Sequence, residues 1–276
     1  MCAYSILFKQ RMTVMKKILS FVLVFAMLVC SLLSFTSCDD NTLTCGVTIF
    51  ANMNEKDANG NWIGFESEFA MEVGKIIGMD VAFQEIEWEN KYEELNSGAI
   101  DCIWNGFTAN SSDNGIKRSD LVDFSYGYML NQQCIVVKAN EVGNYSTAAT
   151  LEGKTACVEG GSAGESYAST VTKKELFKAT SQLNAFTELK AGAVDFIVVD
   201  IVLAKNLCGN GQFADLAIVE SIELDSEIYA VGFKKGSDLT AKVNAAIKEL
   251  EANGKLLELA TKYGFENVLQ VTENIG

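Results

Sequence analysis

Residues 94–103 read ELNSGAIDCI, and residues 188–197 read ELKAGAVDFI. Glu, Leu, Gly, Ala, Asp and Ile recur in register between these two segments. In each segment a helical pattern ends at the glycine and an apolar strand pattern follows. Two ordinary helix-to-strand turns could agree by coincidence, but six identities in register indicate two copies of one structural unit. The repeat therefore predicts two similar lobes.

Apolar strand patterns alternate with amphipathic helical patterns on either side of the repeat. The predicted strands are 46–51, 81–86, 100–104, 128–138, 154–158, 176–179, 194–199 and 228–233, and the predicted helices are 65–77, 88–97, 163–169, 181–191, 201–207, 239–252 and 255–263. Residues 106–123 are expected to be mostly loop with one short helix. The alternation predicts an α/β fold with parallel sheets and helices on their faces. Ligands of such sheets bind beyond the carboxyl ends of the strands, here residues 105–108 and Asp200.

A basic and then apolar segment precedes Cys38. Lys16 and Lys17 stand directly before residues 18–35, which are almost entirely apolar, and small residues follow. This order is typical of a secretory signal peptide, and its end resembles a bacterial lipobox in which Cys38 receives a diacylglycerol. The alternative is an uncleaved transmembrane anchor, because the apolar run approaches the ~20 residues that span a bilayer.

We expect residues 1–38 to be a signal peptide with a lipobox and residues 39–44 to be a tether. Phe35 departs from the lipobox pattern, which usually has Leu at that position. Residues 1–14 do not look like a leader, so translation is expected to start at Met12 or Met15.

The composition excludes several classes of function. The chain has no histidine, which removes Ser-His and Cys-His catalysis and the commonest ligand of transition metals. We therefore expect no catalytic residues, no metal and no cofactor. The net charge of −14 repels phosphate backbones, so nucleic acid is not an expected partner. The simpler explanation of this charge is that it keeps the protein soluble.

The cysteines after Cys38 show neither a CxxC motif nor another metal-binding spacing. They are Cys45, Cys102, Cys134, Cys157 and Cys208. Three of them fall inside apolar strand patterns, so buried free thiols are expected. A disulfide stays open as an alternative, because the sequence cannot pair them.

Several short motifs, in this order and spacing, resemble family 3 of the extracellular solute-binding proteins, the amino-acid-binding proteins of ABC importers. The motifs are NGNWIGFE (59–66), GAID (98–101), NGFT (105–108), VDFS (122–125), VEGGS (158–162), GAVD (192–195) and YAVGF (229–233). The resemblance covers residues 46–265. Asn52 and Gly127 depart from the family, which usually has Pro there, and about five extra residues around 110–114 precede the expected arginine.

The resemblance implies a two-lobed periplasmic-binding-protein-like fold of type II with a two-strand hinge. Lobe 1 would comprise residues 44–134 and 231–276, and lobe 2 residues 135–230. The hinge strands would lie around 133–138 and 228–233. The protein would be a monomer, lipid-anchored on the extracytoplasmic face of the membrane, that binds a free amino acid and delivers it to ABC transporter permease subunits.

The resemblance also assigns the two charged ends of the ligand. Arg118 would bind the carboxylate with the Thr108 hydroxyl and the Gly106 backbone, because a guanidinium matches a carboxylate in shape and charge. Asp200 would accept hydrogen bonds from the ammonium, and Asn105 is a weaker candidate. The alternatives are a solvent-facing Arg118 on a short helix and a helix cap for Asp200.

The remaining candidate site residues would surround the ligand. Ser162 and Ala163 open a helix whose free N–H groups attract an anion, although Ser162 could be a simple helix cap. Phe50 and Trp88, with Trp104, map to the side-chain pocket, and each could equally belong to the core. An aromatic wall with few charges would favour a neutral or moderately polar ligand side chain. Three rival functions are a dehydratase-type enzyme on the same fold, a sensor ectodomain and a structural surface protein.

Overall fold

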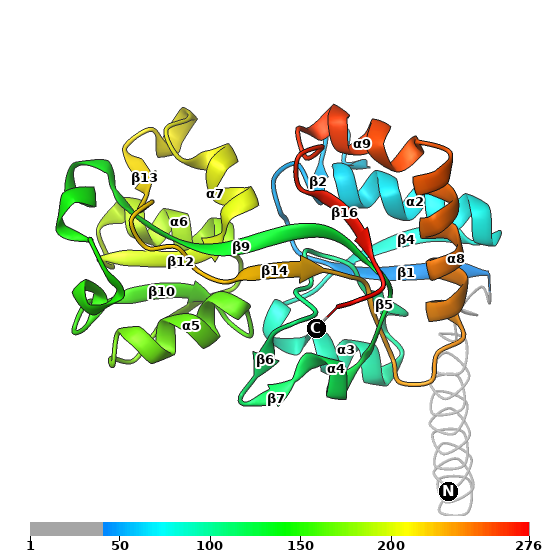
Figure 1. Cartoon of the computed structure of the whole chain (residues 1–276), viewed down its shortest axis with the longest axis horizontal. Helices are drawn as coiled ribbons and strands as arrows, with labels where there is room; N and C mark the ends of the chain where they lie inside the picture. Colours follow the sequence, from blue (N-terminus) through cyan, green and yellow to red (C-terminus); the bar gives the residue numbers. More distant parts are fainter. Residues whose placement is uncertain (1–40, 276) are drawn as a thin grey trace, which may run out of the picture. The chain divides into compact units, whose positions relative to one another are not determined.

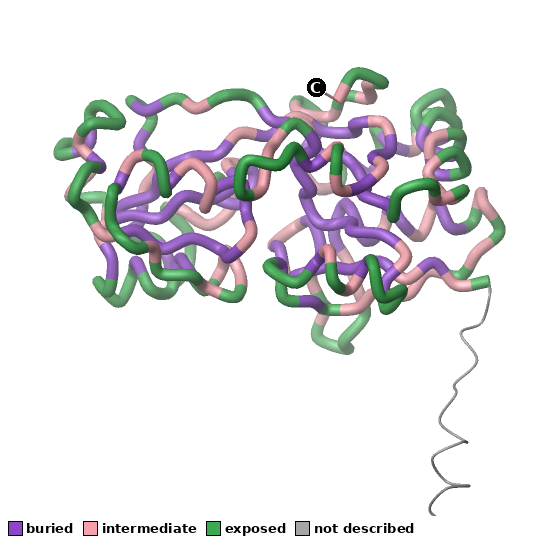
Figure 2. Tube along the Cα trace, turned by 90° about the horizontal axis from the view of Figure 1, so that it is seen from below, coloured by how far each residue is buried: buried purple, intermediate pink, exposed green. Residues whose placement is uncertain are grey.

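The computed structural model of the chain describes residues 41–275. The predicted signal peptide and the lipidation at Cys38 lie outside the described residues. The described chain forms two lobes, each a sheet flanked by helices, with buried strands in the interior of each lobe (Figure 2). None of the helices between residues 41 and 275 has the length and apolar character needed to span a bilayer.

The sheet of the first lobe has five strands in the order β4–β1–β5–β15–β8, of which Figure 1 labels β4, β1 and β5. β1 is parallel to β4 and β5, whereas β15 is antiparallel to β5 and β8. α2, α8 and α9 pack together on one face, and α3 and α4 lie on the other. The strands are Asp80–Glu85 (β4), Thr42–Val47 (β1), Cys102–Ile103 (β5), Gly232–Phe233 (β15) and Asp123–Phe124 (β8), and the helices are Phe65–Ile77 (α2), Leu239–Ala252 (α8), Lys255–Tyr263 (α9), Lys91–Ser97 (α3) and Arg118–Leu121 (α4).

The sheet of the second lobe has the order β11–β10–β12–β9–β13. β10 is parallel to β11 and β12, and β9 is antiparallel to β12 and β13. α6 and α7 cover one face and α5 the other. The strands are Phe177–Ala179 (β11), Ala156–Glu159 (β10), Phe196–Asp200 (β12), Gly127–Lys138 (β9) and Leu216–Ile218 (β13), and the helices are Gln182–Ala191 (α6), Ile201–Leu207 (α7) and Ala163–Val171 (α5).

Strand β9 connects the two lobes. Its residues 133–138 pair with β12 and β13 of the second sheet. Its residues 129–132 pair instead with β14 (Ser226–Tyr229), which leads back to β15 of the first sheet. β16 (Leu269–Thr272) pairs with the beginning of β9. β9 and β14 are thus the two strands that cross between the lobes (Figure 1).

The sequence repeat has the same structure in both lobes. α3 ends at Gly98 and α6 ends at Gly192, and both glycines are left-handed, with φ of 80° and 76°. A strand, β5 or β12, follows within a few residues. The repeated aspartates make the same contact: Asp101 Oδ2 accepts the N–H of Thr44 at 2.8 Å, and Asp195 Oδ2 accepts the N–H of Thr155 at 2.6 Å. The repeat therefore joins each helix end to the neighbouring strand.

The predicted start of the first strand was wrong. β1 covers Thr42–Val47, so it begins inside the predicted tether, and residues 48–51 lie in a turn region where Phe50 bridges to Asn54. Leu43 and Cys45 are fully buried and alternate with threonines, as expected for a strand. The polar threonines made this segment resemble a tether in the sequence.

The segment 106–123 also differs from the expected loop, because it contains a two-strand hairpin before α4. β6 lies within the extra residues around 110–114 and pairs with β7, which follows them. The remaining short elements are β2 (Glu55–Lys56), β3 (Trp62–Ile63), β6 (Ser112–Asp113), β7 (Ile116–Lys117), η1 (Trp88–Asn90), η2 (Ala139–Asn144), η3 (Ala148–Leu151) and η4 (Gly211–Phe213). Two-residue strands carry no readable periodicity, which explains why the hairpin was not predicted.

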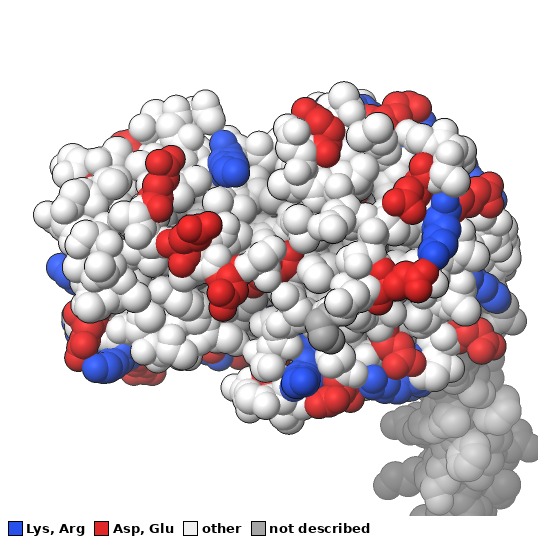
Figure 3. All heavy atoms as spheres, in the orientation of Figure 1, with Lys and Arg blue, Asp and Glu red and all other residues white. Residues whose placement is uncertain are grey.

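The five cysteines of the described chain are free thiols. Cys45, Cys102, Cys134 and Cys157 are buried, as expected, and Cys208 is half-buried. Lysines and arginines are scattered singly or in small groups among acidic side chains on the face shown in Figure 3. That face therefore offers no continuous basic surface to a phosphate backbone.

Candidate functional site

A small buried cavity lies where the two lobes meet. Residues that follow β5, end β10 and end β12 contribute to it, which is the position expected for a ligand of parallel sheets. Its volume is about 10 Å³, roughly the space of one water molecule. Its lining residues are Trp88, Asn105, Gly106, Thr108, Arg118, Gln133, Glu159, Ser162, Ala163, Gln182 and Asp200. Any larger ligand could enter only if the two lobes part.

Eight of the nine residues predicted for the ligand line this cavity, and Phe50 does not. Phe50 lies behind Gly106, where an added Cβ would come within 3.0 Å of the Phe50 ring and 3.1 Å of the Tyr229 ring. Gly106 also has a φ of +56°, so a glycine is needed there on two grounds. Trp104 belongs to the core, because it packs edge-on against Phe69 at a centroid distance of 5.2 Å.

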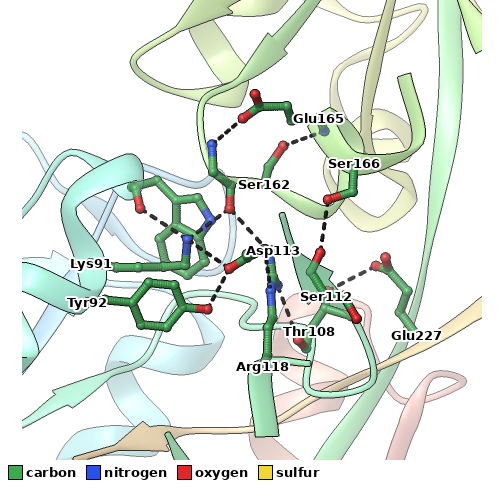
Figure 4. Close-up of polar contacts among 12 residues, drawn as sticks. Lys91, Tyr92, Thr108, Ser112, Asp113, Arg118, Ser162, Glu165, Ser166 and Glu227 are labelled. Carbon is green, nitrogen blue, oxygen red and sulfur yellow. Dashed lines mark hydrogen bonds and ion pairs between the residues drawn. The ribbon is translucent and has the colours of Figure 1, made fainter. Parts of the chain in front are cut away.

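Arg118 is 1% exposed, and its guanidinium is held by an internal carboxylate. Its Nε and Nη2 donate to Asp113 Oδ1 at 3.0 and 2.9 Å. Its Nη1 donates to the Thr108 carbonyl at 3.1 Å, and its Nη2 to the Gly161 carbonyl at 3.2 Å (Figure 4). These contacts use four of the five N–H groups of the guanidinium. One N–H on Nη1 is left for a ligand.

Asp113 lies in the hairpin formed by the extra residues. Besides Arg118, it meets the Lys91 ammonium at 3.5 Å and accepts the Tyr92 hydroxyl at 2.5 Å (Figure 4). Burial alone would raise the pKa of the Asp113 carboxyl, but Arg118 and Lys91 outweigh it and hold that pKa below its ordinary value. The hairpin also reaches the second lobe, because the Ser166 hydroxyl donates to the Ser112 carbonyl at 3.0 Å.

Asp200 does not act as a side-chain cap of α7, although it precedes the first residue of that helix. Its carboxylate accepts Asn131 Nδ2 at 2.5 Å and Gln133 Nε2 at 2.6 Å, and also Gln182 Nε2. The same two amide groups of Asn131 and Gln133 donate to Glu227 Oε2 at 2.6 and 2.9 Å. Burial raises the pKa of Asp200, and it raises that of Glu227 to about 7. Two carboxylates thus share one set of donors.

The other predicted residues are already engaged with the protein. The Ser162 side chain caps α5 by accepting the N–H of Glu165 at 3.0 Å. The Asn105 amide bonds to Thr48 and to Asn54, which fixes the chain beyond β5. The Thr108 hydroxyl donates to Glu227 at 3.1 Å.

Glu66 contacts Gly106, one of the residues that line the cavity. It ends the sequence motif at residues 59–66 and is fully buried. It accepts the Gly106 N–H at 2.8 Å, Asn54 Nδ2 at 2.6 Å and the Tyr128 hydroxyl. Burial raises its pKa to about 7 in spite of these bonds. Glu66 therefore positions the backbone of Gly106.

Sequence reasoning missed Gln133, Glu159 and Gln182. Glu159 ends β10 as Asp200 ends β12, so the rule applied to β12 would also have found it. Burial and the charge of Asp200 raise the pKa of Glu159 to about 8, against smaller opposite effects of Lys91 and of the side chain and backbone of Gln182. Among residues 41–275 no group of three or more His, Cys, Asp or Glu side chains is arranged to hold a metal ion.

The sequence model of the bacterial extracellular solute-binding proteins, family 3, matches residues 43–267. The arginine-binding extracellular protein ArtP of Bacillus subtilis is 27% identical over 74% of this chain and 78% of its own length. The L-cystine-binding protein TcyJ of Escherichia coli K12 is 29% identical over 74% of this chain and 75% of its own length. A substrate-binding protein of an ABC uptake transporter from Streptococcus pneumoniae, solved with bound histidine, has a TM-score of 0.73 and 31% identity, covering 83% of this chain and 95% of that one.

Proposed function

The chain belongs to family 3 of the bacterial extracellular solute-binding proteins, and from this we propose that it captures a free amino acid between its two lobes outside the cytoplasm. One observation carries the proposal. Arg118, from the first lobe, and Asp200, from the second, line one buried cavity with opposite charges. A free amino acid is a zwitterion, so its carboxylate and its ammonium would each meet the opposite charge.

Ligand contacts to both lobes would favour their closure. The carboxylate would accept the remaining N–H of Arg118 and displace part of its contact with Asp113. The free N–H groups at the start of α5 would attract the same carboxylate. The ammonium would be accepted by Asp200. Since only the closed arrangement makes both sets of contacts, the binding energy shifts the population toward that arrangement. The two crossing strands β9 and β14 would bend in this motion.

Delivery to the permease subunits of an ABC importer is the second part of the proposal. It is supported by the similarity to the substrate-binding protein of an uptake transporter from Streptococcus pneumoniae. The protein would act as a monomer and be anchored to the outer face of the membrane through a diacylglycerol on Cys38. The relatives reported above are named for binding rather than for a reaction, which supports a binding protein without enzymatic turnover.

The test of amino-acid binding is a thermal-shift screen of the purified chain against the standard amino acids. A ligand present at one hundred times its Kd stabilises the folded state by about 2.7 kcal/mol. For a chain of this size the melting temperature should then rise by about 5–10 °C. A chain whose melting temperature no amino acid raises at millimolar concentration does not have this function. The ligands named for the relatives differ from one another, so they leave the bound side chain undetermined.

A further inference from the structure

Glu159 has a carboxylate oxygen with no partner inside the binding cavity. The residue is 3% exposed and lines the cavity together with Asp200 and Gln182. Its Oε1 is one of the few buried side-chain oxygens of the described chain that make no hydrogen bond. A buried carboxylate without a counter-charge is strongly unfavourable, so a native site that contains one is expected to receive a proton or a cation there.

The protein supplies no cation to this oxygen. Eleven ion pairs occur among residues 41–275, and Glu159, Asp200 and Glu227 take part in none of them. The two buried cations nearby, Arg118 and Lys91, both pair with Asp113.

The charge of Lys91 lowers the pKa of Glu159, but the Lys91 ammonium makes its hydrogen bonds to other groups. Its ammonium donates to the Gly161 carbonyl at 2.8 Å and to the Trp88 carbonyl at 3.4 Å. Burial, and next the charge of Arg118, lower the pKa of Lys91 to about 8, so its ammonium loses its proton more readily than that of an ordinary lysine. The pKa of Glu159 stays raised, at about 8, in the presence of Lys91.

An amino acid with an uncharged side chain would not supply the counter-charge that Glu159 lacks. Its carboxylate would match Arg118 and its ammonium would match Asp200, and its net charge is zero. Glu159 would remain without a counter-charge. A ligand with one further positive charge would supply it.

We propose that the amino acid bound by this chain carries a positively charged side chain, and that the Glu159 carboxylate receives this charge. The inference rests on the proposed function, since it concerns the same cavity. It replaces the expectation of a neutral or moderately polar side chain, which was based on the aromatic residues alone. Trp88 in the cavity wall does not argue against the new assignment, because an aromatic ring also attracts a cation, as the Lys91 ammonium 5.1 Å from its centroid shows.

Titration calorimetry with matched pairs of ligands tests this inference on the full chain. L-Arginine is compared with L-citrulline, which has nearly the same shape and no side-chain charge, and L-lysine with L-norleucine. At least one cationic ligand should bind about 100-fold or more tightly than its neutral counterpart. In Glu159→Gln this ratio should fall to about threefold or less. The neutral ligand should bind at least as tightly as before, since no buried charge remains to be compensated.

Glu89→Gln is the matched control. It removes a carboxylate that lines a neighbouring pocket and pairs with Lys178, but whose side chain is 58% exposed. The cationic preference should persist in this variant. Glu159→Gln resembles the protonated acid in shape, and an unchanged circular dichroism spectrum would show that it folds.

Three results would overturn the inference. The first is that citrulline and norleucine bind as tightly as arginine and lysine. The second is that Glu159→Gln keeps the full cationic preference. In either case amino-acid binding itself would survive, and only the assignment of Glu159 would fail. The third is that no amino acid of either charge class binds, which would remove the proposed function together with this inference.

Discussion

Arg118 and Asp200 are two charged residues of the proposed binding site. If Arg118 holds the ligand carboxylate and Asp200 the ammonium, removing either leaves a ligand charge buried and unpaired. Such a loss typically costs about 2–5 kcal/mol. Arg118→Ala and Asp200→Ala should therefore each weaken amino-acid binding by about thirtyfold to several thousandfold, as measured by calorimetry.

Lys117 provides the control for this prediction. It adjoins Arg118 but its side chain is exposed, whereas Arg118 is buried. Lys117→Ala removes the same charge and should leave the affinity within about twofold of the unmodified protein. Normal binding by Asp200→Ala would mean that the ammonium is held by another acceptor, such as Glu227.

The sequence could predict some of these residues and not others, for identifiable reasons. Arg118 and Asp200 were predictable because each has a fixed spacing from a motif. Asp113 was not, since it lies in extra residues for which the family offers no counterpart. Glu159 was overlooked although its position at the end of β10 follows the same rule as Asp200.

The β6–β7 hairpin matters at the scale of elements, because it brings a carboxylate to the arginine expected to bind the ligand. Asp113→Asn keeps the shape of the side chain and removes its charge, which leaves Arg118 and Lys91 without their shared counter-ion. The ligand carboxylate should then become that counter-ion, and its affinity should rise by about tenfold. The ligand-free protein should lose about 1–3 kcal/mol of stability. Calorimetry and denaturant unfolding measure the two effects.

The opposite result would also be informative. Weaker ligand binding by Asp113→Asn would show that Asp113 orients the guanidinium rather than competing with the ligand. Ser112→Ala is a suitable control in the same hairpin, since the hydrogen bond from Ser166 of α5 is accepted by the backbone carbonyl of Ser112. It should change neither affinity nor stability.

The repeated aspartates allow a second prediction at this scale. Asp101 accepts the backbone N–H of Thr44 within β1, and Asp195 accepts that of Thr155 directly before β10. Replacing either by alanine leaves that N–H without its partner. Both variants should be destabilised by a similar amount, about 1–2 kcal/mol, in denaturant unfolding. A large difference between them would mean that the repeat is similar in sequence but not in energetics.

The elements themselves were largely predictable, because long helices and buried strands show clear periodicity. α2, α6, α8 and β9 lie where the pattern indicated them. The beginning of β1 was missed because its exposed side chains are polar threonines. The hairpin was missed because two-residue strands are too short for any period to be visible.

Buried carboxylates set the pH dependence of the whole molecule. Burial raises the pKa of Glu66 and Glu227 to about 7, and burial with the charge of Asp200 raises that of Glu159 to about 8. Below about pH 4.5 these acids are protonated in the folded and in the unfolded protein. As the pH rises above that value, the unfolded chain loses these protons first. The stability of the ligand-free protein should therefore fall as the pH rises from about 5 to 8, by up to about 3 kcal/mol per group.

Denaturant midpoints at pH 5.5 and 8.5 measure this effect. Asp113 and Asp195 act in the opposite sense, because their pKa values are lowered, but their contribution is lost only in more acidic solution. In Glu159→Gln the denaturant midpoint should depend less on pH, since the glutamine side chain has no acidic proton to lose. A midpoint that rises between these two pH values would contradict the prediction.

Strand β15 has a consequence for how the chain is made. In the first sheet it lies between β5 and β8, yet its residues, 232 and 233, are synthesised more than a hundred positions after both. The first sheet therefore cannot close while the ribosome is still translating the second lobe, whose strands β9 to β13 lie within residues 127–218. We expect a released chain truncated after residue 225 to contain a protease-resistant second sheet and a digestible amino-terminal half. The amino-terminal half of such a chain is still unfolded, and an unfolded segment is one that can be threaded across a membrane.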